Sequence, residues 1–382
     1  MKQNISAGAT FLTLVVALSV IQPAHEEASA AQGQKPGTAV PTFQVDALWP
    51  KPLPNNWTFG EFSGLAVDSH DHVWINQRPK TLADDEKYLL ANPPPGDCCT
   101  PGPSIMEFDA EGNFVQGWGG PAPGYEWPEN EHGVYVDYKD NVWVGGNGAK
   151  DAQILKFTKT GKFLMQIGHM GKSAGSNDVE NLNRPSKMQV SQKTNELYVS
   201  DGYGNRRVIV FDADTGQYKR HWGAYGNKPD DAAPRTLVPE GPGPKQFNLV
   251  HGLRLSKDDL VYVSDRLNNR IQVFKTDGTF VKEGFIARKT LGNGAAYDVD
   301  VSSDPQQRFL YVPDGMNNHV WILNRDTLEV VGRFGRQGRY AGQFHHVHNI
   351  AVDSKGNIYT AETQGKRVQK FTFKGVSSAS SR

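Results

Sequence analysis

Hydrophobic and polar residues alternate in short runs along most of this chain, and the runs belong to one recurring unit. Each unit has a first strand, a tight polar turn, a second strand that ends in Asp or a substitute, and a third strand. The turns are rich in Asp, Asn, Ser and Gly, which tolerate the backbone of tight hairpins. The six copies start at residues 64, 133, 187, 252, 298 and 349. No helical periodicity of useful length follows the first thirty residues, so the pattern predicts an all-β chain.

The spacing of these units predicts a six-bladed β-propeller. Blade-sized β units that recur at roughly forty to fifty residues, plus insertions, are typical of that architecture. The segment that begins at Phe43 is expected to add an outer strand to the last blade, close the ring and remove exposed sheet edges. We expect one propeller over residues 43–374, a flexible linker over 31–42 and a disordered tail over 375–382.

The apolar run near the N-terminus follows a different pattern. Residues 11–21 are about as long as the apolar core of a signal peptide, Lys2 supplies a weak positive charge, and residues 28–30 (ASA) offer a cleavage site. The run is short for a transmembrane helix, so an uncleaved anchor is the less favoured alternative. We therefore expect residues 1–30 to be a signal peptide and the protein to be periplasmic or extracellular.

Composition narrows the classes of partner. The chain has 41 Lys+Arg and 41 Asp+Glu, so it offers no basic field for nucleic acid or an anionic membrane. We expect a monomer that meets the membrane only during export. Its two cysteines, Cys98 and Cys99, are adjacent in a Pro/Gly-rich insertion. Neighbouring cysteines bridge rarely and cannot tie distant segments together, so we favour an inert loop over a soft-metal site or a link to another chain.

The six units differ most at the residue just before each first strand. Histidine precedes this strand in units two, four and six, and a residue that bears a hydroxyl group precedes it in units one, three and five. These residues are, in order, Ser63, His132, Ser186, His251, Tyr297 and His348. Alternate blades of such a ring are related by about a third of a turn, so three imidazoles would converge on the central channel.

Three converging imidazoles with a fourth position open to water or substrate form the ligand set of a catalytic zinc site. Such a metal acts as a Lewis acid or makes a hydroxide at neutral pH. A single histidine of this kind usually caps its strand through a hydrogen bond, but strict alternation favours a metal site. Copper, iron, cobalt and manganese also accept three imidazoles, so the sequence leaves the metal open.

Other polar residues are expected at the same mouth of the channel. Arg78 follows the second strand of unit one, and Tyr203 and Arg266 follow the corresponding strands of units three and four. An arginine fork suits a carboxylate, and a tyrosine near a metal can act as a base. As alternatives, Arg266 belongs to the repeat's own polar network and Tyr203 covers its blade. His346 either supports His348 or replaces it as a ligand.

Two resemblances follow from these residues. The spacing of Asp265, Asn268 and Arg270 resembles the NHL-type repeat, whose polar groups usually bond within and between blades. From about residue 62 to residue 373 the chain also resembles the peptidyl-α-hydroxyglycine α-amidating lyases. That likeness is densest in the segments SGLAVD, HGVYVDYKDNVWV, SDGYGNRRVIVF, VHGLRLS and VHNIAVDSKGNIY.

The resemblance to the amidating lyases implies a set of site residues. It implies zinc on His132, His251 and His348, an active site that contains Arg78 and Tyr203, and Arg266 as a further arginine. It also implies a structural calcium ion on the backbone carbonyl groups of Leu65 and Val134 and the side chain of Asn349. We expect zinc as the cofactor, with calcium as a second ion.

The sequence departs from that family at three positions. Asn349 stands where the family has an aspartate, which removes a charge and weakens the calcium prediction. His346 replaces a methionine, and Gly204 replaces a cysteine, so the family's disulfides are missing. No copper monooxygenase domain precedes the expected propeller, so we expect nothing in this chain to make the hydroxyglycine substrate.

The leading hypothesis is a zinc-dependent carbon–nitrogen lyase of peptide amidation. It would cleave the C–N bond of a peptidyl-α-hydroxyglycine-like carbinolamide, a peptide or small molecule with a carboxylate, to an amide and glyoxylate. One alternative is a lactonase-like hydrolase, although such sites usually include carboxylate ligands and the six aligned positions have none. Another is an NHL-type binding scaffold that uses the insertions at 79–104 and 226–246.

Overall fold

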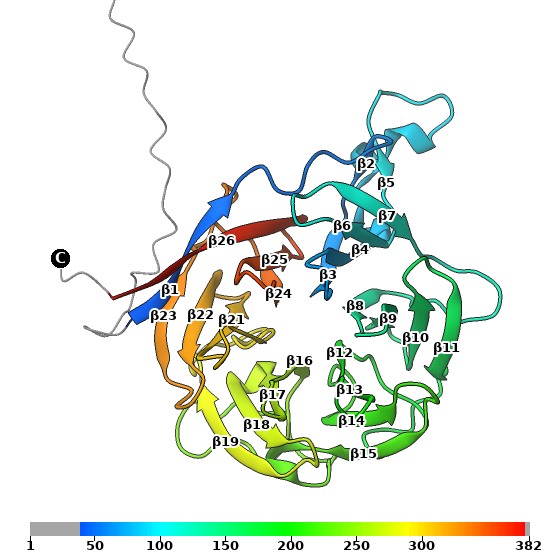
Figure 1. Cartoon of the computed structure of the whole chain (residues 1–382). Coiled ribbons are helices and arrows are strands. Elements are labelled where there is room, and N and C mark those ends of the chain that lie inside the picture. The colour runs from blue at the N-terminus through cyan, green and yellow to red at the C-terminus, as the bar shows by residue number, and fades with distance from the viewer. Residues whose placement is uncertain (1–38, 379–382) are drawn as a thin grey trace, which may run out of the picture.

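Residues 39–378, which the computed structural model describes, form a ring of six four-stranded antiparallel sheets (Figure 1). The chain is thus the six-bladed β-propeller that its repeats predict. The expected signal peptide, residues 1–30, lies outside the described residues. Within the described part of the chain, no helix is long and apolar enough to span a bilayer.

Each blade is one sheet with consecutive strands running outward from the centre of the ring (Figure 1). Blades one to three contain β3 (Glu61–Val67), β4 (Val73–Arg78), β6 (Ile105–Phe108) and β7 (Phe114–Trp118); β8 (Glu131–Val136), β9 (Asn141–Gly146), β10 (Gln153–Thr158) and β11 (Phe163–Gly168); and β12 (Lys187–Val190), β13 (Glu196–Asp201), β14 (Arg207–Asp212) and β15 (Tyr218–Trp222). Blades four and five contain β16 (Val250–Leu255), β17 (Leu260–Asp265), β18 (Arg270–Lys275) and β19 (Phe280–Phe285); and β20 (Asp300–Val301), β21 (Phe309–Asp314), β22 (His319–Asn324) and β23 (Val330–Phe334).

Blade six is built from both ends of the described chain. Its strands are β24 (Val347–Val352), β25 (Ile358–Glu362), β26 (Arg367–Ser378) and, outermost, β1 (Ala39–Asp46). Phe43 lies opposite Phe373, and the Thr42 hydroxyl donates to the carbonyl oxygen of Gly375 at 3.2 Å. The expected closing strand is therefore present, and its pairing extends beyond the limits of 43 and 374 because backbone hydrogen bonds continue along both edges.

Apolar clusters fill each of the six interfaces between neighbouring blades. Strand β13 shows how the alternating sequence produces them. Leu197 and Val199 pack toward blade two, whereas Tyr198 between them packs toward blade four. Successive side chains of a strand point to opposite faces, so both faces of a blade can be buried against its neighbours. This packing fixes the distance of every innermost strand from the axis.

Aspartates that end the first strand hold the turn and the second strand together. The Asp137 Oδ1 accepts hydrogen bonds from the backbone N–H of Lys139 and Asn141, each at 2.9 Å, and its Oδ2 accepts from Trp143 Nε1 at 2.9 Å. Asp68 with Trp74 and Asp353 with Tyr359 repeat this arrangement in blades one and six. These aspartates, which are distinct from the Asp that ends the second strand of a unit, are therefore structural residues.

The insertion after β4 carries short elements and the two cysteines. A two-residue parallel pair, β2 (Trp57–Thr58) and β5 (Thr100–Pro101), anchors it, together with η1 (Pro79–Thr81), η2 (Asp84–Glu86) and η3 (Tyr88–Leu90). The remaining 3-10 turns are η4 (Ala224–Gly226) and η5 (Arg266–Asn268).

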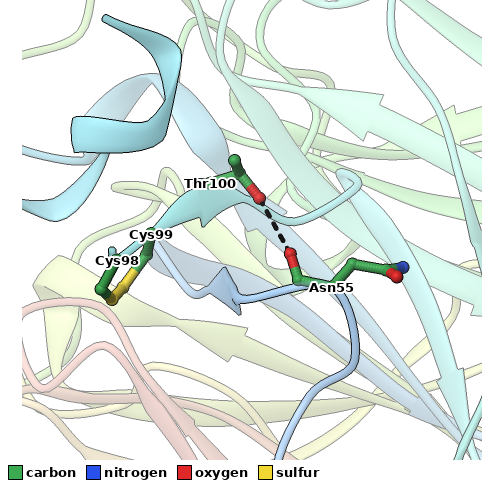
Figure 2. Close-up of a disulfide and its surroundings, with 4 residues drawn as sticks. All are labelled: Asn55, Cys98, Cys99 and Thr100. Carbon is green, nitrogen blue, oxygen red and sulfur yellow. Dashed lines mark hydrogen bonds between the residues drawn. A yellow bond between two sulfur atoms is a disulfide. The ribbon is translucent and has the colours of Figure 1, made fainter. Parts of the chain in front are cut away.

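Cys98 and Cys99 form a disulfide with each other (Figure 2). This bridge was not expected, because neighbouring cysteines bridge rarely, and it leaves the prediction of an inert loop untested. Next to the bridge, Thr100 Oγ1 donates to the carbonyl oxygen of Asn55 at 3.3 Å. A bridge between neighbours closes no long loop, so the β2–β5 pair is what ties the insertion to the preceding chain.

Candidate metal centre and active site

A β-bulge lies at or directly after each of the three alternating histidines. The pairing of β8 with β9 shifts between His132 and Val134, and the pairing of β16 with β17 shifts at His251. The same shift occurs at His348 between β24 and β25. A bulge adds one residue to a strand and re-aims a side chain locally. The three imidazoles can thus turn toward the axis while the strands behind them keep their regular pairing.

The three imidazoles meet in the centre of the ring. The ring centroids of His132 and His251 are 5.1 Å apart, those of His132 and His348 5.0 Å, and those of His251 and His348 4.7 Å. One nitrogen from each lies within 4.8 Å of the others, and all three side chains are buried. The structure therefore brings together the three residues that the sequence alternation selects.

Hydrogen bonds at Nδ1 orient the imidazoles. The Nδ1 acceptors are the carbonyl oxygen of Ser186 for His132 (2.9 Å), the carbonyl oxygen of Tyr297 for His251, and Oδ1 of Asn349 for His348 (2.6 Å). A nitrogen that faces such an oxygen carries the proton, which leaves the Nε2 lone pair free.

The pKa values of all three histidines lie well below the ordinary value. Burial is the main cause, because it disfavours the charged imidazolium. The cationic Arg266 and the neighbouring groups of the site lower the pKa values further. The imidazoles are therefore neutral near pH 7, which is the protonation state that metal ligation requires. Three neutral imidazoles that converge in this way fit the nitrogen donor set of zinc.

The hydroxyl group of Tyr203 lies against two of these histidines. Its oxygen is 3.1 Å from His132 Nε2 and 3.0 Å from His251 Nε2. The hydroxyl has one proton, so it donates to one imidazole at a time. Arg266 Nη1 donates to the same oxygen at 3.3 Å. Tyr203 Oη thus lies beside the point where the three imidazoles converge.

The two predicted arginines approach this centre from opposite parts of the ring. Arg266 Nε donates to the carbonyl oxygen of Asn293 at 2.7 Å, and its guanidinium lies 3.8 Å from the centre of the Tyr297 ring. Arg78, in blade one, donates through Nε to the carbonyl oxygen of Glu131 at 2.9 Å. Both side chains are buried, so water screens their charges weakly.

Two further residues lie beside these groups, and the sequence pattern assigns no role at the site to either of them. Glu61 Oε2 is 3.3 Å from Arg78 Nη1, across the β3–β4 pair. Tyr297 occupies the aligned position of blade five, and its hydroxyl lies 3.3 Å from His346 Nε2. Burial raises the pKa of Tyr297 to about 12 and lowers that of His346 to about 4. Among the described residues, His346 therefore pairs with Tyr297 and lies outside the group of three converging histidines.

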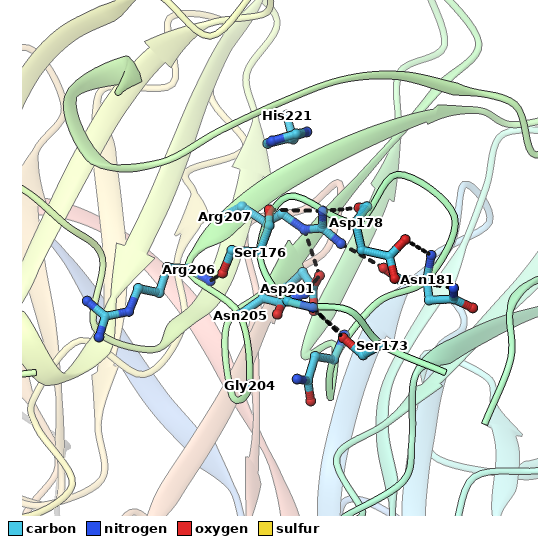
Figure 3. Close-up of polar contacts among 12 residues, drawn as sticks. Ser173, Ser176, Asp178, Asn181, Asp201, Gly204, Asn205, Arg206, Arg207 and His221 are labelled. Atoms are coloured by element: carbon cyan, nitrogen blue, oxygen red, sulfur yellow. Dashed lines mark hydrogen bonds and ion pairs between the residues drawn. The ribbon is translucent and has the colours of Figure 1, made fainter. Parts of the chain in front are cut away.

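The polar residues of the NHL-type pattern bond within their blades. Asn268 Nδ2 and Arg270 Nε donate to Asp265 Oδ2 at 2.7 and 2.8 Å. In blade three, Asn205 and Arg207 do the same to Asp201, and Arg207 continues to backbone carbonyls of the preceding loop (Figure 3). The structural interpretation of this motif is confirmed.

A second group of metal-binding residue types lies in blade one and already contains a cation. Asp68, His72 and Glu107 bring one ligand atom each within 4.8 Å. The Lys159 ammonium lies 3.2 Å from Asp68 Oδ2 and 3.0 Å from Glu107 Oε1. The lysine compensates both carboxylates, so this group carries no metal prediction.

The residues predicted for calcium are spread over three innermost strands. Leu65 and Val134 are buried on β3 and β8, and Asn349 is buried on β24. The Asn349 side chain bonds His348 through Oδ1, while its Nδ2 lies 3.4 Å from Asp298 Oδ2.

Comparison with known proteins adds relatives to this geometry. The model of the NHL repeat matches residues 247–274, which form most of blade four. NHL repeat-containing protein 3 of Homo sapiens is 27% identical over 348 residues, which cover 86% of this chain and 84% of that protein.

Amidating enzymes are also similar over most of the chain. The peptidylglycine alpha-amidating monooxygenase of Rattus norvegicus is 26% identical over 93% of this chain but only 35% of its own length. The probable peptidyl-alpha-hydroxyglycine alpha-amidating lyase of Caenorhabditis elegans is 23% identical over 81% of each chain. The expected resemblance to NHL-repeat proteins and amidating lyases is thus confirmed. A solved streptogramin B lyase covers 87% of this chain with a TM-score of 0.52 at 13% identity, a likeness of fold.

Proposed function

We propose that this chain is a zinc-dependent lyase that cleaves the C–N bond of peptidyl-α-hydroxyglycine-like carbinolamides. The observation that carries the proposal is the group of three neutral, buried histidines with Tyr203 Oη within 3.1 Å of two of them. The similarity to proteins named amidating lyases supports the choice of reaction.

Zinc held by the Nε2 atoms of His132, His251 and His348 supplies a Lewis acid beside the substrate oxygen. Tyr203 Oη is placed to take the proton of the substrate hydroxyl group. The hydroxyl oxygen then forms the aldehyde carbonyl as the C–N bond breaks. The bonding electron pair leaves on nitrogen, which takes up a proton. The products are a primary amide and glyoxylate, and no oxidant or reductant is consumed.

Arg78 and Arg266 would hold the carboxylate of the substrate in this proposal. Arg266 is pre-oriented by Asn293 and by the Tyr297 ring, and Arg78 by the carbonyl group of Glu131. A guanidinium that is already fixed loses little entropy when a carboxylate binds, and its planar fork matches the two oxygens. We propose a small molecule or a peptide that ends in α-hydroxyglycine as the substrate.

An assay of the purified protein tests this function. The protein, loaded with zinc, is given N-benzoyl-α-hydroxyglycine, and benzamide and glyoxylate are measured. We expect equal amounts of the two products and about one metal ion per chain, with both metal and turnover lost in His251→Ala.

Two results would redirect the assignment. Opening of lactones without cleavage of α-hydroxyglycines would favour a metal-dependent hydrolase, although the three-histidine group contains no carboxylate. A protein that takes up no metal even when zinc is offered would favour a binding propeller.

A further inference from the structure

A second set of aligned positions lies one residue beyond the histidines on the innermost strands. Blades one, two and four have glycine there, and the other three blades have charged or amide side chains. The set consists of Gly64, Gly133, Lys187, Gly252, Asp298 and Asn349. The three side chains that are not glycine are connected to one another.

Lys187 and Asp298 connect blades three and five past blade four. Lys187 Nζ donates to Asp298 Oδ1 at 2.6 Å and to Oδ2 at 2.7 Å, and the carboxylate side chain is fully buried. Between them blade four has Gly252, where an added Cβ would lie 2.5 Å from Asp298 Oδ1. Glycine is needed at this position because any larger residue would collide with the carboxylate of the ion pair.

The remaining lone pairs of Asp298 are also used. The backbone N–H of Val299 donates to Oδ1 at 2.8 Å, and the backbone N–H of Ile350 donates to Oδ2 at 3.2 Å. A buried carboxylate persists when a cation and hydrogen bonds compensate it, and both are present here. The ion pair therefore joins blades three and five, and the Ile350 bond extends it to blade six.

Asn349 links this ion pair to the histidine centre. His132 and His251 each bond the backbone carbonyl of the next blade, at Ser186 and Tyr297. His348 breaks that pattern and bonds Oδ1 of the adjacent Asn349 at 2.6 Å. The other end of the same carboxamide faces Asp298 Oδ2. A continuous path thus runs from Lys187 through Asp298 and Asn349 to His348.

A calcium ion on Leu65, Val134 and Asn349 does not fit this arrangement. Calcium takes six to eight oxygen ligands, and tight sites use carboxylates. Asn349 is neutral, and its single side-chain oxygen is occupied by His348 Nδ1. The neighbouring carboxylate, Asp298, is already neutralised by an ammonium group.

We propose that the Lys187 ammonium group takes the place of a bound cation in this propeller. Through Asp298 it joins the innermost strands without calcium, and through Asn349 it positions His348. The calcium-free closure does not depend on the proposed function. The positioning of His348 rests on the histidines binding a metal, and it does not require any particular reaction.

Thermal unfolding of the metal-free protein tests the closure. Wild type is expected to unfold at the same temperature with and without millimolar calcium. A clear rise in the unfolding temperature of the wild type with calcium would overturn the proposal.

A double-mutant cycle tests the ion pair. Lys187→Met and Asp298→Asn should each lower the unfolding temperature, because each leaves one charge of the pair without its partner. The double variant should lose less than the sum of the two. Additive losses would contradict the proposal. If Lys187→Met fails to fold, recovery of folded protein when Asp298→Asn is added gives the same answer, and continued failure of the double variant contradicts it.

Zinc affinity tests the link to His348, measured by competition with a chromophoric chelator so that no turnover is needed. Asn349→Leu keeps the approximate shape but removes the acceptor, and it should weaken zinc binding about 10- to 100-fold. Asn349→Asp restores an acceptor and should recover most of that loss. Unchanged affinity in Asn349→Leu, or equal loss in both variants, would contradict the positioning role.

Discussion

Removal of the Tyr203 hydroxyl tests the proposed general base without removing any of the three histidines. Its ring packs edge-on against His132 and His251, with centroids 5.1 and 5.4 Å apart, so a phenylalanine can keep the packing. Only the oxygen between the two Nε2 atoms is lost. Tyr203→Phe is therefore expected to lower kcat by about 10²- to 10⁴-fold, the usual effect of losing a general base. Elemental analysis should show unchanged zinc content, and a variant with normal turnover would sink this role.

Arg78 offers a test of carboxylate recognition. Lysine at this position keeps the positive charge but loses the planar guanidinium, whose Nε bonds Glu131 and whose Nη groups lie against Glu61 and Asn147. Arg78→Lys should raise KM about 10- to 100-fold, the cost of one charge-assisted hydrogen bond. The comparison is a substrate whose carboxylate is replaced by a neutral amide, on which wild type and variant should differ little. Equal losses on both substrates would contradict the assignment.

His319 makes the stability of the protein depend on pH. It is 6% exposed, and burial lowers its pKa to about 4. His319 takes up a proton near pH 6.5 in the unfolded chain but only near pH 4 in the folded chain. Its contribution to the free energy of unfolding is therefore fully present above pH 6.5 and is lost as the pH falls from 6.5 to 4. The total is about 3 kcal/mol at about 1.4 kcal/mol per pH unit.

Urea unfolding at pH 7, 5.5 and 4.5 measures that contribution. His319→Gln should lose less free energy of unfolding than wild type between pH 6.5 and 4. His70→Gln, at an exposed turn, should follow the wild type. A constant difference between wild type and His319→Gln across this range would mean that His319 does not titrate as stated.

At the level of elements, the alternating pattern predicts which residues form strands and which face each neighbour. It does not predict the bulges at His132, His251 and His348, because a bulge is a property of the register between two strands. The sequence therefore finds the three histidines by their alignment but cannot show how the backbone orients them. The contact between Tyr297 and His346 cannot be predicted from the pattern either, because it joins residues of different blades.

The turn aspartates stabilise the hairpin between the first and second strands of a blade. Asp137 satisfies two backbone N–H groups and the buried indole of Trp143, and alanine would leave all three without that acceptor. Asp137→Ala is expected to lower the free energy of unfolding by about 2–4 kcal/mol, since buried unsatisfied donors cost about 1–3 kcal/mol each and partial solvation recovers some of this. Denaturant unfolding measures the loss. Asp85→Ala, on an exposed 3-10 turn, is the control and should change stability by under about 0.5 kcal/mol.

At the scale of the whole molecule, six repeated units were enough to predict the propeller and its closing strand. Repeats carry this information because each unit repeats the same local pattern and only a ring buries every blade. The Lys187–Asp298 pair and the Cys98–Cys99 bridge were not predictable in this way. Both occur once, at positions where the other units have different residues.

Export is a prediction for the intact chain. The small residues at 28–30 should direct cleavage after Ala30, so N-terminal sequencing of protein from the periplasm or medium should begin at Ala31. Replacement of Ala30 by Arg should leave the uncleaved precursor with the membrane fraction. A wild-type protein that keeps Met1 or its neighbours after purification from the cytosol would contradict the prediction.

The pairing of β1 with β26 sets the order in which the protein can mature. Thr42 bonds Gly375, which lies 333 positions later in the chain. Strand β1 can therefore pair with β26 only after nearly the whole chain has been synthesised. The ring that brings His132, His251 and His348 together is complete only after this closure. A chain truncated before β26 is therefore expected to lose the zinc affinity proposed for these histidines, which chelator competition measures.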